Sequence, residues 1–128
     1  MKYYFSKILR TSFDAAVERV KEGLKKEDFG VLTDIDVRAT LKAKLGVDFE
    51  KYRILGACSP KHAYEALKKE NKIGTMLPCN VIVREVREGE VEVAAIDPIA
   101  SMQAVENPAL VGLAQSVQQK LRSVVESL

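Results

Sequence analysis

The chain has 128 residues, of which 47% are hydrophobic and 30% charged, and its formal net charge is +2 at pH 7. This length fits a single domain, residues 1–128, with a self-standing core. No apolar run approaches the roughly 20 residues that span a bilayer, and the opening MKYYFSKILR lacks the apolar block of a signal peptide. We therefore expect a cytoplasmic protein with no membrane partner.

Charge is spread unevenly along the chain. Residues 1–72 carry 16 Lys/Arg and 11 Asp/Glu, a net charge of +5, whereas residues 73–128 carry 4 and 7, a net charge of −3. No stretch is as densely basic as a nucleic-acid-binding surface usually is. The pattern predicts no nucleic-acid partner. The asymmetry favours self-association or a weakly basic face, and we expect a homodimer.

The first part of the chain predicts strand, helix, strand and helix in turn. Residues 2–10 alternate imperfectly and predict a strand, and Thr11 or Ser12 suits the cap of the helix that follows. Residues 29–37 alternate with period two, which is typical of a second strand. Its polar face holds Asp34 and Asp36, which we interpret as solvent-exposed because no third ligand accompanies them. Residues 38–45 predict a short helix.

The second part predicts a strand, a helix, a hairpin and two further helices. Residues 51–58 form the strand, and Ser59-Pro60 opens a helix that runs to about Asn71. The hairpin pairs residues 79–87 with 90–96 around a two-residue turn, which places Arg84 opposite Val93, near the sheet edge or a carboxylate. Asp97-Pro98 starts a short helix. The last helix, after residues 107–108, has the strongest amphipathic pattern in the chain.

These elements predict an α+β fold with a sheet of about five strands and helices packed mainly on one face. A parallel α/β sheet is the alternative. Its strands, covered on both faces, are usually continuous apolar runs, and the predicted strands are not.

The two cysteines mark the candidate site. Cys58 ends one predicted strand and Cys79 begins the next, so antiparallel pairing of these strands places both thiols at the same end of the sheet, with Asp97. Two helices begin there, and helix N-termini stabilise anions and lower thiol pKa values. His62 lies in the first turn of one of them. The spacing matches no standard zinc site, and we predict no metal and no cofactor.

A family resemblance extends over nearly the whole chain. The segments LGACSPKHAYEAL, GTMLPCNVIVRE and AAIDP resemble the domain-of-unknown-function family 302 (DUF302) of small bacterial and archaeal proteins. The resemblance implies a curved, mostly antiparallel sheet backed by helices, grouped with TATA-binding-protein-like architectures. The resemblance does not imply DNA binding, because fold alone does not carry function. Residues that match the family pattern are Gly56, Cys58, Pro60, Pro78, Cys79, Asp97 and Pro98; Ser59 stands where the family pattern has Asn.

Three functions are compatible with these observations. The first is a binding module with a small pocket for a small anionic or thiol-reactive ligand, lined by Gly56, Cys58, Ser59, Cys79, Asn80 and Asp97. The second is a cysteine-dependent enzyme or redox protein that uses Cys79 or Cys58, with His62 as a possible base. The third is a protein-interaction module that uses the curved sheet or the last helix. The simplest alternative is that both thiols only fill the core, since free cysteine is among the most buried residue types.

Overall fold

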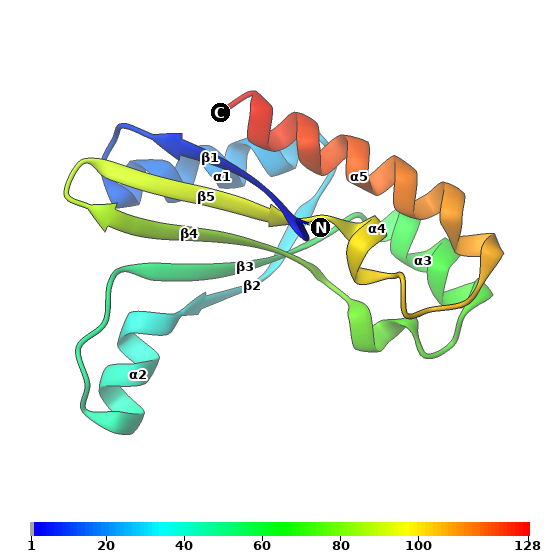
Figure 1. The fold of residues 1–128 in the computed structure, drawn as a ribbon, viewed down its shortest axis with the longest axis horizontal. Helices are drawn as coiled ribbons and strands as arrows, with labels where there is room; N and C mark the ends of the chain where they lie inside the picture. The colour runs from blue at the N-terminus through cyan, green and yellow to red at the C-terminus, as the bar shows by residue number, and fades with distance from the viewer. Residues whose placement is uncertain (1) are drawn as a thin grey trace.

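The computed structural model describes residues 2–128, and these contain five strands, five α-helices and two short 3₁₀ helices (Figure 1). In chain order the elements are β1 (Tyr4–Leu9), α1 (Phe13–Lys26), β2 (Gly30–Asp36), α2 (Val37–Leu45), β3 (Tyr52–Cys58), α3 (Pro60–Lys69), η1 (Ile73–Met76), β4 (Cys79–Arg87), β5 (Glu90–Ile96), α4 (Pro98–Ser101), η2 (Pro108–Leu110) and α5 (Val111–Glu126).

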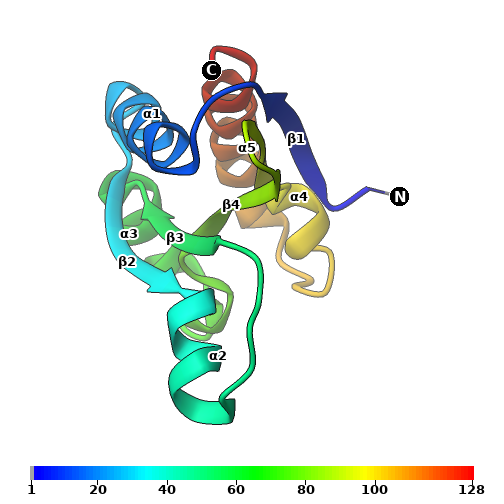
Figure 2. The ribbon, with the colours of Figure 1, turned by 90° about the vertical axis from the view of Figure 1, so that its left-hand side faces the viewer.

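The strands form one open sheet in the order β1-β5-β4-β3-β2, and each neighbouring pair is antiparallel. This confirms the predicted α+β class and excludes the parallel alternative. In Figure 2, α1 and α5 lie on one side of the sheet, and α2 projects beyond the end of the edge strand β2. The sheet therefore has a helical face, covered by α1 and α5, and an open face.

The main core lies between the helical face and the two long helices. Strand residues at alternate positions point into it, as the period of a strand requires. The apolar stripes of α1 and α5 complete it, and the stripe of α5 is the amphipathic pattern predicted for the last helix. Its buried members are Leu9, Phe13, Ala16, Val17, Val20, Leu24, Phe29, Leu55, Ala57, Val81, Val83, Val91, Val93, Ala95, Leu121, Val124 and Val125. A second, smaller cluster of Ala66, Ile73 and Leu110 lies under α3.

A β-bulge in the hairpin corrects the predicted pairing of Arg84. Arg87 pairs with Glu90 as predicted, but the register shifts between Glu85 and Arg87, so that Arg84 lies opposite Glu92 rather than Val93. The guanidinium donates to Glu92 at 2.7 Å and to Glu50 at 2.9 Å. The expectation that Arg84 meets a carboxylate is therefore confirmed.

Asp34 and Asp36 both have structural partners. Asp34 accepts two hydrogen bonds from Arg53, at 2.6 and 2.7 Å, and lies 3.0 Å from Lys21. The pKa of Asp34 falls to about 2, mainly because of the hydrogen bond from Arg53. Asp36 is the N-cap of α2, and its carboxylate accepts from the backbone N–H of Ala39. Both residues are exposed, so the interpretation of Asp34 and Asp36 as solvent-exposed is confirmed, and the structure adds an ion pair at Asp34 and a helix cap at Asp36.

Candidate functional site

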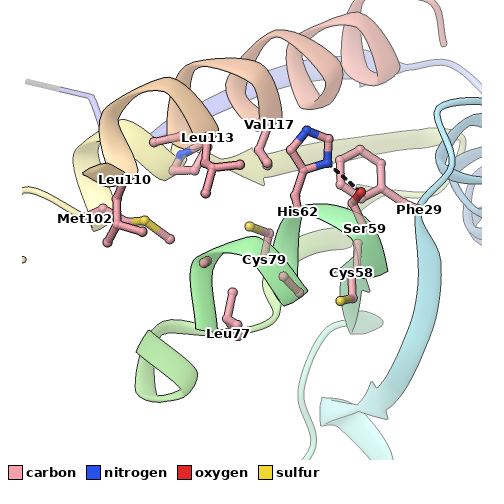
Figure 3. A pocket seen from close by; sticks show the side chains of 15 residues that line it. Phe29, Cys58, Ser59, His62, Leu77, Cys79, Met102, Leu110, Leu113 and Val117 are labelled. Carbon is pink, nitrogen blue, oxygen red and sulfur yellow. Dashed lines mark hydrogen bonds between the residues drawn. The ribbon is translucent and has the colours of Figure 1, made fainter. Parts of the chain in front are cut away.

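A pocket lies where the ends of β3 and β4 meet α3, α4 and α5 (Figure 3). Its cavity has a volume of about 40 Å³, enough by the same measure for roughly three water molecules. Apolar side chains form most of the wall. The lining residues are Phe29, Ala57, Cys58, Ser59, His62, Ala63, Ala66, Leu77, Cys79, Pro98, Met102, Leu110, Leu113, Ala114 and Val117.

The polar end of the pocket is built from Ser59 and His62. Ser59 occupies the N-cap position of α3, but its side chain caps no backbone N–H. Its hydroxyl instead lies 2.7 Å from Nδ1 of His62 (Figure 3), and Nε2 of His62 lies 3.0 Å from the hydroxyl of Ser116 on α5. Ser59 is 7% exposed. A buried hydroxyl needs such a partner, and one neutral imidazole supplies both a donor and an acceptor.

The charge state of His62 follows from its surroundings. Burial lowers the pKa of His62, and the positive charges of Lys120 and Lys61 lower it further. The imidazole is therefore neutral at pH 7. The pocket presents a hydroxyl and a neutral ring at this end, and neither attracts an anion as an imidazolium would.

The two cysteines meet at this end of the sheet as predicted, but they point to different sides of it. Cys79 is the register partner of Ala57 and shares the helical face with it, whereas Cys58, the next residue, points to the opposite side. Figure 3 shows the Cys79 sulfur beneath Leu113 and directed toward the side of the pocket where Met102 lies. Both are free thiols.

Neither thiol is activated by its environment. Burial raises the pKa of Cys58. Burial, with a smaller contribution from Cys58, raises the pKa of Cys79 to about 11. Because the thiolate is the nucleophile and the metal-binding form, both cysteines are protonated wall residues at neutral pH. Desolvation outweighs the expected effect of the helix N-termini.

The other predicted residues lie beside the pocket rather than in its wall. Asp97 is the N-cap of α4, and its carboxylate accepts from the N–H of Ile99 and from Nε2 of Gln118, each at 3.0 Å. Its neighbour Pro98 lines the pocket. Gly56 and Asn80 are register partners on the open face. A Cβ atom on Gly56 would lie 2.7 Å from Cγ of Pro78 and closer still to Oγ1 of Thr33, so Gly56 is required by packing.

Sequence reasoning missed the wall that α5 supplies. Ser116, Leu113 and Val117 belong to the amphipathic stripe of the last helix or border it, and that stripe indicates burial but not a pocket. Ser116 is 54 residues from His62, so no local spacing connects them. Within residues 2–128 no group of three or more His, Cys, Asp or Glu side chains is placed to hold a metal ion.

Fold and pocket together define a class: an α+β protein with an open antiparallel sheet and a small apolar pocket at one end of its helical face. Residues 5–128 match the family model described as "Domain of unknown function DUF302", so the chain belongs to this family. The chain is similar to the crystal structure of an uncharacterized conserved DUF302 protein from Bacillus stearothermophilus, at 28% identity and a TM-score of 0.89 over 98% of both chains. A comparison with proteins of curated function finds no match.

Among the described residues, no helix has the length and apolar character that a membrane span requires.

Proposed function

We propose that this protein binds a small, uncharged, mostly apolar molecule in the pocket between β3, β4, α3 and α5, with the Ser59 hydroxyl, which His62 orients, contacting one polar group of the ligand. The single observation that carries the proposal is the composition of the wall: apolar side chains surround one hydroxyl and one neutral imidazole. Small-molecule sites typically combine an apolar surface with a few polar groups in this way.

The size of the cavity limits the ligand. About 40 Å³ accommodates a short aliphatic group, or the end of a longer molecule that extends to solvent. Ligands of a few heavy atoms bind weakly, because even the best of them gain at most about 1.5 kcal/mol per non-hydrogen atom. A charged group is disfavoured, because placing a charge in this wall requires an ionic partner and His62 is neutral at pH 7.

Cysteine chemistry is the weaker candidate. A thiol of pKa about 11 is almost wholly protonated at neutral pH, and a nucleophilic cysteine needs a lowered pKa or an adjacent base. His62 already contacts Ser59 and Ser116 through its two ring nitrogens. These contacts favour His62 as a group that holds the pocket together over His62 as a base for either cysteine.

The test compares two probes that share a carbon chain and differ in charge. 1-Butanol and butyrate are titrated separately into ¹⁵N-labelled protein, and amide chemical shifts are followed. We expect 1-butanol to shift amides of α3 and α5 around the pocket, with saturation, and butyrate to shift them at least tenfold less at the same concentration. Equal or tighter binding of butyrate would contradict an uncharged ligand, and no saturable shift with either probe would contradict a binding pocket.

A further inference from the structure

The open face of the sheet has an apolar row where a solvated face would be polar. Ile35, Ile54, Ile82 and Ala94 are successive register partners across β2, β3, β4 and β5. Antiparallel sheets with one solvated face usually alternate apolar and polar residues cleanly along each strand. Here both faces are apolar at the centre, although within residues 2–128 α1 and α5 cover one of them and the open face has no such cover (Figure 2).

Aromatic side chains surround a hollow on the same face. The hollow has a volume of about 350 Å³, and Tyr3, Tyr4 and Tyr52 line it, three of the four tyrosines in the chain. The rings of Tyr3 and Tyr4 pack edge to face at 5.1 Å, and Phe49 lies 6.2 Å from Tyr52, which extends the aromatic surface toward α2. Tyrosine and phenylalanine are enriched in the central parts of protein interfaces.

Helix α2, like the open face of the sheet, is not packed against other parts of this chain by any buried side chain. It has nine residues and no buried side chain, and Leu45 is 69% exposed. Isolated helices shorter than about 12 residues are marginal in water, so a helix of this length normally depends on packing. Val47 and Phe49, in the connector that returns from α2 to β3, are exposed as well.

We propose that the open face and α2 form a two-fold symmetric interface between two copies of this chain. A two-fold interface requires each surface to contain both halves of the contact. This chain has a projecting helix with an exposed leucine and a sheet face with an apolar row, so the helix of each copy can cover the open face of the other. The interface lies on the side of the sheet away from the main core and is independent of the proposed ligand.

Charge indicates the orientation of the two copies. Helix α2 carries Arg38, Lys42 and Lys44 and no acidic residue, a charge of +3, whereas the hairpin from Arg84 to Glu92 carries four Glu and two Arg, a charge of −2. Figure 1 shows α2 and the β4–β5 turn at the same end of the sheet. A two-fold axis parallel to the strands therefore places the basic α2 of one copy against the acidic hairpin of the other.

The test measures oligomeric state in matched variants. Sedimentation equilibrium up to about 100 μM covers the μM-to-pM affinities that interfaces of standard size show, and we expect the native chain to be a dimer. Leu45→Glu places a negative charge on α2 and should weaken the dimer at least about 30-fold. Val111→Glu changes an apolar residue that is 54% exposed at the start of α5 and should leave the dimer intact.

Each other outcome overturns the proposal. A monomeric native chain excludes the interface, and a dimer that survives Leu45→Glu does not use α2. If both variants lose the dimer with unchanged melting temperatures, the start of α5 also belongs to the interface. That result would contradict an interface made by the open face and α2. Amide exchange gives a second readout that needs no substitution: protection of α2 should fall when the protein is diluted below the dissociation constant, and protection independent of concentration would contradict the proposal.

Discussion

Ser59 and His62 form a hydrogen-bonded pair of 2.7 Å within the first turn of α3, and this pair replaces the expected helix cap. The second ring nitrogen of His62 lies 3.0 Å from the hydroxyl of Ser116, so the ring connects α3 to α5 across the pocket. Burial lowers the pKa of His62. The connection between the two helices is therefore made by an uncharged ring.

Stability should fall as pH drops through the range where histidine titrates. In the unfolded chain His62 has a pKa near 6.5, and in the folded chain its pKa is lower. The unfolded state therefore binds more protons as pH falls below about 6.5, which lowers the free energy of unfolding. His62→Gln should remove this dependence. Urea denaturation of both proteins at pH 7.5 and pH 5 gives the comparison.

His62 is the only histidine in the chain, so a second measurement can isolate it. A titration of its ring protons by NMR reports the folded pKa directly. A value at or above 6.5, or the same pH dependence of stability in the wild type and in His62→Gln, would contradict the assignment of a neutral, partly buried ring.

Cys79 should resist alkylation in the folded protein. With a pKa of about 11, roughly one molecule in 10⁴ carries the thiolate at pH 7, and the thiolate is the reactive form. Iodoacetamide should label Cys58 faster than Cys79, and both slower than in unfolded protein. Peptide mass spectrometry after timed quenching resolves the two sites. If Cys79 is labelled faster in the native protein than in the denatured chain, its thiol is activated by the fold. That result would favour the function as a cysteine-dependent enzyme.

Gly56→Ala should destabilise the protein by about 1–3 kcal/mol, because the added methyl group overpacks the contact with Thr33 and Pro78. Gly112→Ala is the matched control. Gly112 lies in α5 with open space around it, and alanine there should be neutral or stabilise by up to about 1 kcal/mol. Denaturant unfolding measures both. Equal stability of the two variants would show that Gly56 is not under packing constraint.

Asp34→Asn should lower stability at pH 7 by about 1 kcal/mol, a value reduced for the partial exposure of the ion pair. The folded pKa of Asp34 is about 2, below the unfolded value near 3.8. Its stabilising effect is therefore complete above about pH 4 and lost as pH falls toward 2. Asp48→Asn, whose side chain is 88% exposed, should change little. If both variants behave alike, the pairing with Arg53 contributes nothing.

The sequence predicts the elements of this fold well because local patterns determine them. Alternation within the strands, the apolar stripes of α1 and α5, and the Asp97 cap before Pro98 all depend on residues a few positions apart. The bulge in β4 was missed. It adds one residue to one strand and leaves no clear local signal, yet it moved Arg84 from Val93 to Glu92.

The candidate site was predictable only in part. Antiparallel pairing was enough to bring Cys58 and Cys79 to the same end of the sheet. The partner of His62, by contrast, comes from a helix 54 residues away, and its position depends on how α5 packs on the sheet. The raised pKa values of the thiols could not be predicted from the sequence either, because desolvation depends on every side chain around the pocket.

The most direct measurement of the central claim is the affinity for 1-butanol of two leucine variants, followed by amide shifts. Ala63 lines the pocket, and Ala63→Leu fills part of the roughly 40 Å³ cavity. Ala15 lies exposed on α1, so Ala15→Leu adds the same atoms away from the pocket. The account predicts that Ala63→Leu abolishes saturable binding while Ala15→Leu binds like the wild type. Unchanged binding by folded Ala63→Leu would contradict it.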